Sequence, residues 1–418
     1  MSATLKIPRS AWGSGSPNGF FTEWRLGLNA SGWALGYGMI ILWRLIRHHI
    51  PIDEAGKDCI DFTWIWLSSK FALSGNLVHA YDFSVFSAAR SLLVGPPNCI
   101  LEHLDYPPTL LLFTYPLGLM PYSMAFAAWI AATALLYLAA IYAIIPARTA
   151  VIAALTPYPV YVNILLGHNG FLTAGLIGLT LAFMERRPWL AGIFLGLLTY
   201  KLQFGILFPL ALLASRNWRV LLSATTASLV IALIAAITFG YQVWPSFLDT
   251  LIERGSSLNG DIGLNLFLVS VFGFLRAMGV SANISWTAQL LVSGVVAVAV
   301  SALWAPPIPH SLRAAAIAIG SVLAAPHAFS YDFCILSIAV AFLVKDGLAR
   351  GFLPREPAVM LVCWIGLNFL FGPYPFGPFL VIISAVLLVL VIRRAVLLQS
   401  ETPPLAPGHV VQTQAMQA

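Results

Sequence analysis

Long uninterrupted apolar runs recur along the 418-residue chain, with short polar segments between them. A helix crosses a ~30 Å hydrocarbon core with about 20 such residues, whereas a membrane β-barrel would show alternating apolar and polar positions. The pattern predicts an all-α, polytopic transmembrane protein with roughly 10 to 13 crossings. The runs are 31–47, 107–120, 122–145, 149–166, 170–184, 188–213, 220–239, 264–278, 285–305, 312–345, 358–371 and 374–392.

Two runs are predicted to be hairpins, because Lys and Arg collect on the inner side of a membrane. A single crossing by 188–213 would put one of its two flanking basic clusters outside, so we expect two shortened helices that meet near Lys201. By the same reasoning 312–345 turns back at 326–332. The basic clusters are Arg186-Arg187, Arg216 with Arg219, Lys345 to Arg355, and Arg393-Arg394.

The long polar segment 48–106 is predicted to be the first extracytoplasmic loop and to carry the catalytic group. Its acidic residues far outnumber its basic ones, and a loop poor in Lys and Arg is typical of the outer face. The acids are Asp53, Glu54, Asp58, Asp61, Asp82, Glu102 and Asp105. Residues 1–30 are expected to be a cytoplasmic N-terminal segment, 31–395 a single transmembrane domain, and 396–418 a disordered cytoplasmic tail.

Three smaller features complete the predicted topology. One of the three apolar runs between 107 and 166 is a candidate re-entrant segment, because the number of crossings there does not fit the charge pattern. The acidic stretch 240–262 is expected to be a second outer loop. Segment 264–278 is short, contains Arg276, and is expected to lie along the membrane surface.

Composition excludes several classes of function. Hydrophobic residues make up 59% of the chain and charged residues only 9%, against about 25% charged in soluble domains. The net charge of +6 comes from basic residues dispersed near helix ends, so no nucleic-acid partner is expected. The sequence holds no Walker loop, dinucleotide glycine fingerprint, HExxH helix, paired CxxC motif or Gly-x-Ser-x-Gly elbow. We therefore expect no cofactor and no metal, and a lipid-linked rather than a nucleotide-linked donor.

The cysteines fall into two groups. Cys334 and Cys363 lie in apolar runs, where a thiol behaves as a small hydrophobic group. Cys59 and Cys99 lie in the acidic loop and could form a disulfide if that loop is extracytoplasmic. The sequence leaves this pairing open, because it does not show whether the two Cα atoms approach.

Asp61 is the strongest candidate for catalysis. It precedes Phe62, Thr63, Trp64 and Trp66, a pattern that suits a helix in the interface with its aromatic side chains among lipid headgroups. A carboxylate held there could act as a general base on a lipid-linked substrate. The alternative is an ordinary aromatic belt that happens to contain an acid.

Five further polar residues lie at turns between apolar runs. Lys201 lies between two apolar arms, where burying a charge in the membrane costs free energy. It is therefore either a phosphate ligand or a lysine whose long side chain reaches the interface. His168 and Asn169 form a turn, which Gly and Asn also favour for structural reasons alone. His327 and Asp332 share the other predicted hairpin and could simply lock it as a pair. On the predicted topology these residues face the same outer side as Asp61, which favours one common site.

The pieces together resemble glycosyltransferase family 87, within the GT-C class of membrane glycosyltransferases. The resemblance spans about residues 31 to 345 and depends on the order of short motifs. These are Asp61-Phe62, Ala80-Tyr81-Asp82, Tyr106-Pro107-Pro108-Thr109, Pro116-Leu117-Gly118, Pro121-Tyr122 with Trp129, Gly167-His168-Asn169-Gly170, Arg187-Pro188, Ala191-Gly192 to Lys201, Trp218-Arg219 and Pro326-His327 to Tyr331-Asp332. The chain departs from the family pattern at His168 and Leu202, where glutamine and proline are favoured.

The resemblance implies transfer of a sugar, typically mannose, from a polyprenyl-phosphate sugar, as in the phosphatidylinositol-mannoside mannosyltransferases. Its catalytic carboxylate matches Asp61. We expect an inverting transfer to a lipid or glycan hydroxyl at the periplasmic face of a bacterial inner membrane, in contact with membrane lipids. Lys201 and His327 are expected to bind the donor phosphate. The residues expected to bind substrate are Tyr106, His168, Asn169, Gln203 and Asp332.

Two other functions are compatible with the pattern. A transporter or flippase would also place polar residues within an apolar scaffold, although it would not need the long acidic loop. A transferase of acyl or phosphoethanolamine groups would usually need a metal site or a nucleophile that the sequence does not show.

Overall fold

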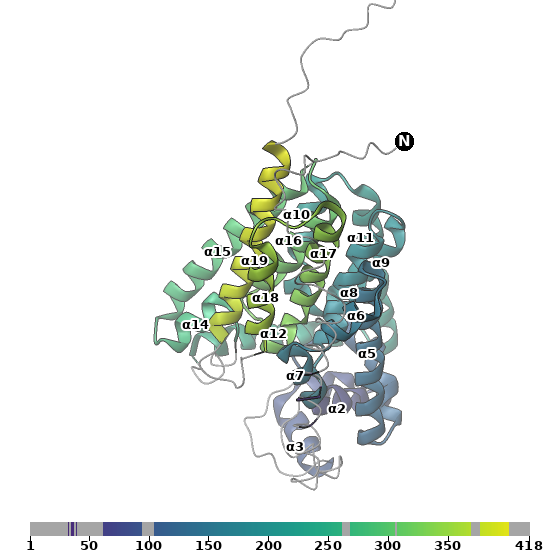
Figure 1. Ribbon diagram of the computed structural model, residues 1–418. Helices are drawn as coiled ribbons and strands as arrows, with labels where there is room; N and C mark the ends of the chain where they lie inside the picture. The colour runs from purple at the N-terminus through teal and green to yellow at the C-terminus, as the bar shows by residue number, and fades with distance from the viewer. Residues whose placement is uncertain are drawn as a thin grey trace, which may run out of the picture.

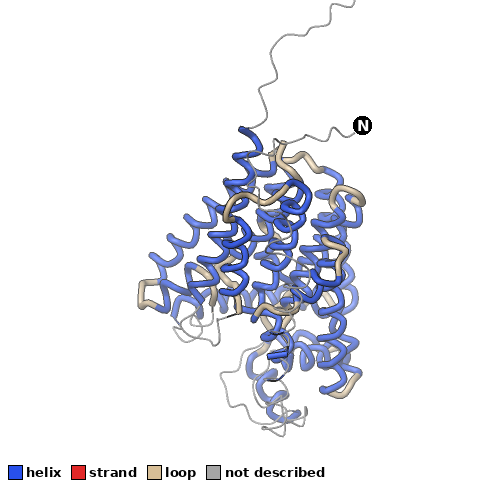
Figure 2. The backbone as a smooth tube through the Cα atoms, viewed as in Figure 1, coloured by secondary structure: helices blue, strands red, loops and turns tan. Residues whose placement is uncertain are grey.

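In the computed structural model the apolar runs form helices that stand side by side as a bundle (Figure 1). The structure describes residues 32, 35–36, 39, 62–93, 104–260, 268–305, 307–368 and 377–400, without the side chains of 254–260 and 377–378. Figure 2 shows the described chain as helices joined by short loops, without β-strands. The predicted class, an all-α polytopic membrane protein, is confirmed.

Short helices dominate the first half of the described chain. They are α2 (Phe62–Leu73), α3 (Phe83–Leu93), α4 (Pro108–Thr114), α5 (Tyr122–Ile144), α6 (Arg148–Ala154), α7 (Tyr158–Leu166), α8 (Gly170–Phe183) and α9 (Pro188–Leu197). The second half contains α10 (Leu207–Ala214), α11 (Trp218–Phe239), α12 (Val243–Gly260), α14 (Val271–Ala277), α15 (Ala282–Trp304), α16 (His310–Ala324), α17 (Cys334–Arg350), α18 (Glu356–Gly366) and α19 (Gly377–Ser400). The 3₁₀ helices are η2 (Leu77–Tyr81), η3 (Tyr115–Leu119), η4 (Leu198–Phe204) and η5 (Ser330–Phe333).

Four described helices are long and apolar enough to cross a membrane alone, namely α5, α11, α15 and α19. The pair α6 and α7 meets at 68° and forms a fifth span if it is counted as one broken helix. The other apolar helices are shorter; α8, with 14 residues, is about 21 Å long. A pair of helices bent this sharply is either one broken span or a re-entrant loop, so the predicted re-entrant segment stays a prediction. The total number of crossings stays a prediction.

The run 188–213 is broken into two helices, as predicted from its flanking charges. Lys201 interrupts η4 with a non-helical backbone (φ −141°, ψ 65°). Helix α9 runs parallel to α11, because Gly192 lies against Ser223 and Gly196 lies against Ala227. Since α10 connects the far end of α9 to the start of α11, it must return through the bundle. The two helices therefore form a hairpin with Lys201 at its turn.

The run 312–345 is also a hairpin, formed by α16 and α17 with η5 at the turn. The start of α16 lies beside the end of α8, where His310 Nε2 is 2.8 Å from the Leu181 carbonyl oxygen. Arg313 pairs with Glu185 across 3.7 Å at the same place. The basic clusters thus share one end of the bundle, and the turns that begin α8, break η4 and precede α17 share the other.

An ion cluster closes the basic end. Arg394 of α19 donates to Asp346 of α17 at 2.5 Å and to Glu356 of α18 at 2.6 Å. Glu356 also accepts from the Leu353 amide at 2.7 Å. All three charged side chains are buried, so each charge depends on its partners for stabilisation. The cluster holds three helices in register where the bundle meets the basic side.

Helix α2 differs from the prediction of an interfacial helix with its aromatic side chains among headgroups. Phe62 is fully buried and stands edge-on to Tyr122 and Phe126, with ring centroids 5.4 and 5.3 Å apart. Trp66 packs on Tyr122 in the same way. The first turns of α5 carry these aromatic partners, and edge-to-face packing stabilises such pairs. Figure 1 shows α2 and α3 beside the lower end of α5, beyond the main bundle.

Other expected loops are partly helical. Most of 240–262 forms α12, and α19 continues through Ser400 into the segment expected to be a tail. Asp82 caps α3, because its carboxylate accepts from the Ser84 hydroxyl and from the Ser84 and Val85 amides. These bonds, the hydroxyl first, hold the pKa of Asp82 below its usual value. Cys59 and Cys99 and most of the first run lie outside the described residues.

We predict that Gly192→Ala destabilises the fold by about 1–3 kcal/mol, since an added methyl group overpacks the α9–α11 contact. A Cβ at position 192 would lie 2.4 Å from Ser223 Cβ and 2.7 Å from the Val220 carbonyl oxygen. Gly294→Ala is the matched control, because no atom lies within 4 Å of a Cβ there. Thermal unfolding of both purified variants in detergent measures the difference. Equal stability of the two variants would contradict the close packing.

Candidate functional site

A buried ion pair forms the centre of the candidate site, at the end of the bundle opposite the basic clusters. Lys201 Nζ donates to Asp332 Oδ1 at 2.5 Å and to Asn169 Oδ1 at 2.8 Å. Lys201 is 4% exposed and Asp332 is fully buried. The lysine therefore does not reach the interface by itself, and one ammonium group joins the α8 start, the η4 turn and the α16–α17 hairpin.

Tyr200 fixes the backbone next to Lys201. Its hydroxyl shares a 2.5 Å hydrogen bond with Thr173 and donates to the Asn169 carbonyl oxygen at 3.3 Å. The ring is almost fully buried. With Tyr200 held against α8, the non-helical backbone at Lys201 directs the lysine toward Asn169 and Asp332.

The backbone amide at the start of α8 is capped by Asn163 and not by Asn169, the residue at the N-cap position. Asn169 occupies the cap position, but its side chain makes no cap hydrogen bond. Instead Asn163 Oδ1, on α7, accepts from the Gly170 amide at 2.8 Å. Asn163 Nδ2 donates to the Tyr331 carbonyl oxygen at 2.9 Å. Asn163 thus gives the first amide of α8 a hydrogen-bond acceptor. The Asn169 side-chain oxygen is then available to accept from Lys201.

Gly170 has to be a glycine because the chain segments are so close here. A Cβ at this position would lie 2.3 Å from the Tyr331 carbonyl oxygen and 2.7 Å from Asn163 Nδ2. Real Cβ atoms essentially never come so near backbone oxygen. The missing side chain allows α8 to meet the turn before α17.

His168 and Lys201 share an aromatic neighbour. The His168 ring stacks on Tyr331 with centroids 3.7 Å apart and planes 17° from parallel. Lys201 Nζ lies 4.7 Å from the centroid of the same ring, within the range of a cation–π contact. Tyr331 thus connects a titratable imidazole to the ion pair.

His327 lies in the turn before α17, and hydrogen bonds fix the shape of that turn. The Phe329 amide donates to Asp332 Oδ2 at 3.1 Å, and the Val269 amide donates to the Ala328 carbonyl oxygen at 2.7 Å. Gln203 Nε2 donates to the His327 carbonyl oxygen at 3.4 Å. His327 and Gln203 are only partly buried, and both are near the ion pair in the chain, since Gln203 follows Lys201 and His327 precedes Asp332 in the same turns.

Tyr106 connects the outer segments to this site. Its carbonyl oxygen accepts from the Tyr81 hydroxyl at 2.9 Å. Its ring lies 6.4 Å from that of Tyr200, at a tilt of 44°. Tyr81 also packs on Phe247 of α12. The end of the acidic loop therefore lies against the hairpin that carries Lys201.

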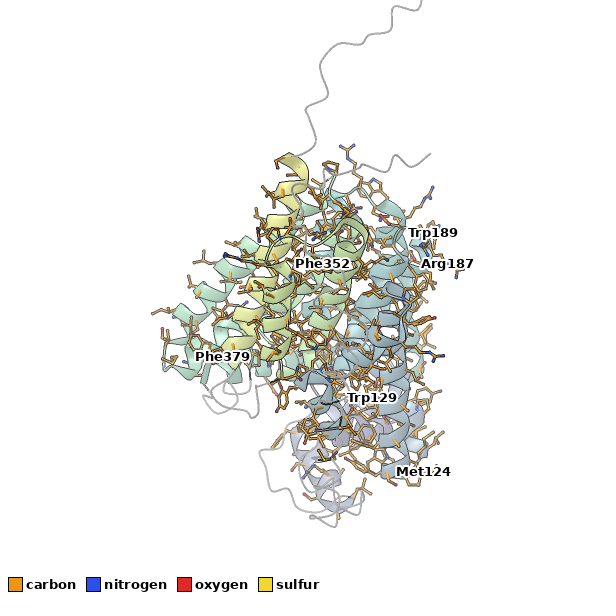
Figure 3. The ribbon with its side chains drawn as sticks, viewed as in Figure 1. Met124, Trp129, Arg187, Trp189, Phe352 and Phe379 are labelled. Carbon is orange, nitrogen blue, oxygen red and sulfur yellow. The ribbon has the colours of Figure 1, made fainter. Side chains whose placement is uncertain are left out.

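Asp61 lies outside the described residues, but Phe62, which follows it in the chain, is described. Gly167, with φ of +66°, ends α7 in the left-handed region, and a Cβ there would lie 2.4 Å from Phe62 Cβ. Trp129, labelled in Figure 3, donates to the Gly167 carbonyl oxygen at 3.0 Å. Phe62 is thus held against the residue that precedes His168.

The structure brings together the candidates His168, Asn169, Lys201, His327 and Asp332 from three separate turns. Asp332 forms its ion pair with Lys201, across two hairpins. Sequence reasoning did not identify Asn163, Tyr200 or Tyr331. A lone amide within the apolar segment that became α7 was the available signal for Asn163. Nothing in the local sequence indicated that Tyr331 would stack on His168.

The charge of the central pair is balanced, because one buried ammonium faces one buried carboxylate. The pair as a whole therefore offers no net charge to an anionic ligand. Among the described residues, no three His, Cys, Asp or Glu side chains gather as a metal site.

A model of glycosyltransferase family 87 matches residues 104–330, which is more than half of the chain. The chain therefore belongs to glycosyltransferase family 87 and is a membrane glycosyltransferase. The matched segment contains Tyr106, the α8 start, the Lys201 turn and His327, while Asp61 and Asp332 lie outside it. No curated protein and no solved structure matches the chain.

We predict that Lys201→Met and Asp332→Asn each destabilise the protein, by up to about 3–5 kcal/mol, because each leaves a buried partner without its ion pair. The double variant Lys201→Met/Asp332→Asn should recover most of that loss, since no unpaired charge is left. Chemical or thermal unfolding of the three variants in one detergent measures the coupling. Losses that simply add in the double variant would show that the pair does not contribute as a unit.

Proposed function

We propose that this chain transfers a hexose, typically mannose in the family it resembles, from a polyprenyl-phosphate sugar to a lipid or glycan hydroxyl. Family membership supports the reaction class. The observation that carries the site is the gathering of His168, Asn169, Lys201, His327 and Asp332 at one end of the bundle, although they come from distant parts of the sequence. A lipid-linked donor suits a chain whose described residues form an apolar bundle around that end.

Asp61 is proposed as the general base. As the acceptor oxygen attacks the anomeric carbon, its proton passes to the Asp61 carboxylate. The bond between that carbon and the phosphate oxygen breaks, and polyprenyl phosphate leaves with the bonding electrons. One displacement inverts the anomeric centre. The position of Phe62 against Gly167 supports this role, because Asp61 is joined directly to Phe62 and Gly167 directly to His168.

Lys201 and His327 are proposed to bind the donor phosphate. Preorganised cations stabilise a leaving group whose negative charge grows in the transition state. Asp332 and Asn169 hold the lysine in place before substrate arrives. His327 adds an imidazole that can donate a hydrogen bond to a phosphate oxygen. In this role the balanced ion pair holds the lysine in position, and the histidine supplies a further hydrogen-bond donor.

The remaining polar residues are proposed to bind the sugar and the acceptor. Asn169, Gln203 and Asp332 carry amide and carboxylate groups suited to sugar hydroxyls, and Tyr106 and His168 carry rings with polar atoms. Tyr106 and Gln203 are partly buried, whereas His168, Asn169 and Asp332 are buried around the lysine. Specificity between hexoses would then depend on which hydroxyls these groups reach.

The site is proposed to face the periplasm of a bacterial inner membrane. The support is the charge distribution: the arginine clusters lie at the end of the bundle opposite the ion pair, and such clusters mark the inner side. Figure 3 labels Arg187 and Trp189 toward the upper end of the molecule and Met124 at the lower end. A transporter or flippase is the rival function, and family membership favours the transferase.

Asp61→Asn should lower kcat on the order of 10²-fold or more, with little change in donor affinity, because it removes the base and keeps the size of the side chain. Sugar transfer is measured from polyprenyl-phosphate mannose at matched expression. Asp53→Asn and Asp58→Asn are the matched controls from the same acidic segment and should stay active. A normal rate for Asp61→Asn together with a dead Asp58→Asn would reassign the base.

Single cysteines should report the orientation. In a background without native cysteines, Ser74→Cys should react with a membrane-impermeant maleimide added outside intact cells, and Arg187→Cys should react only after lysis. Both native side chains are exposed, so access to the reagent depends only on the side of the membrane. Labelling of position 187 alone in intact cells would reverse the orientation and move the proposed site to the inner face.

A further inference from the structure

A groove of about 650 Å³ lies between α18 and α19, far along the chain from the residues of the candidate site. Figure 1 shows the two helices as neighbours, and Figure 3 labels Phe379 at the lower part of α19. The lining residues are Arg355, Ala358, Val359, Val362, Cys363, Gly366, Phe379, Ile382, Ile383 and Val386. The volume lies within the range of about 300–1,000 Å³ typical of sites for small ligands.

The groove is apolar and follows the helix axes. Its α18 side is a stripe with helical spacing that starts at Arg355 and ends at Gly366. Those positions span about 16 Å at 1.5 Å per residue, close to half of a ~30 Å hydrocarbon core. Val362 is 69% exposed and Phe379 is 52% exposed. The shape and lining suit one hydrocarbon chain that lies along the membrane normal.

Positive charge is concentrated at one end of the groove. Arg355 belongs to the lining itself, and Arg393 lies seven residues beyond Val386, on the same face of α19. Both arginine side chains are exposed. The neighbouring Arg394 points instead into the buried ion cluster.

The arginines near the Arg355 end of the groove outnumber the carboxylates there. Arg350, Arg355, Arg393 and Arg394 contribute +4, and the buried carboxylates Asp346 and Glu356 contribute −2, which leaves +2. Within the described residues, no carboxylate forms an ion pair with Arg355 or Arg393. An arginine fork matches a phosphate well.

We propose that this groove binds an anionic phospholipid from the leaflet at the basic end of the bundle. One acyl chain lies between α18 and α19, and the phosphate contacts Arg355 and Arg393. Basic pockets between membrane helices are suited to such head groups. The charged end of the groove lies beside the Arg394 cluster, at the opposite end of the bundle from Lys201, so the proposal does not depend on the proposed transferase mechanism and does not describe its donor.

The test measures which lipids stay with the purified protein. Wild-type and variant proteins are reconstituted in vesicles of equal parts phosphatidylglycerol and phosphatidylcholine, extracted in mild detergent, and analysed by native mass spectrometry. Wild type should retain phosphatidylglycerol preferentially. Arg355→Gln/Arg393→Gln should lower that retention by roughly tenfold or more, as expected for lost charge-assisted hydrogen bonds. Arg148→Gln, at an exposed arginine outside the groove, should retain it normally.

A second pair of variants tests the place of the acyl chain. Val362→Trp fills the groove and should lower retention, whereas Val389→Trp should not, because Val389 is 61% exposed on α19 but outside the lining. Equal retention of the two lipids by wild type, or equal behaviour of the two tryptophan variants, would overturn the proposal. Preferential capture of added polyprenyl phosphate over phosphatidylglycerol would also overturn it.

Discussion

The buried ion pair between Lys201 and Asp332 is the interaction on which the candidate site depends. Asp332 removes the cost of a lone ammonium inside an apolar bundle, and the 2.8 Å bond to Asn169 extends the connection to α8. Three turns that are distant in sequence therefore have fixed relative positions. The same pair makes this end of the bundle electrically balanced, because one buried ammonium faces one buried carboxylate.

The sequence predicted the arrangement of helices well where charge and apolar length acted together. The run 188–213 was recognised as a hairpin because a single crossing would have separated two basic clusters, and the run 312–345 was recognised in the same way. Where only composition was available, prediction failed. The aromatic side chains of α2 suit a membrane interface and a protein interior equally well, and only the partner surface on α5 decides between them.

The candidate residues were also found largely from the sequence, because a charged or polar side chain is rare between apolar runs. Their mutual contacts were not predictable. Pairing of Lys201 with Asp332 requires knowledge of which turns become neighbours, and 131 residues separate the two. The supporting residues were harder still. Asn163 matters because it replaces a helix cap, and Gly170 matters because no side chain fits below the Tyr331 carbonyl oxygen.

The long stretch of sequence between Lys201 and Asp332 has a consequence for how the protein is inserted into the membrane. The α9–α10 hairpin leaves the ribosome long before Asp332 has been synthesised, so for this interval Lys201 has no native carboxylate. The nascent hairpin must keep its ammonium group in water or among headgroups until α16 and α17 have been inserted. The candidate site is thus assembled late, after most of the surrounding helices are already in the bilayer, and insertion of the second hairpin completes it.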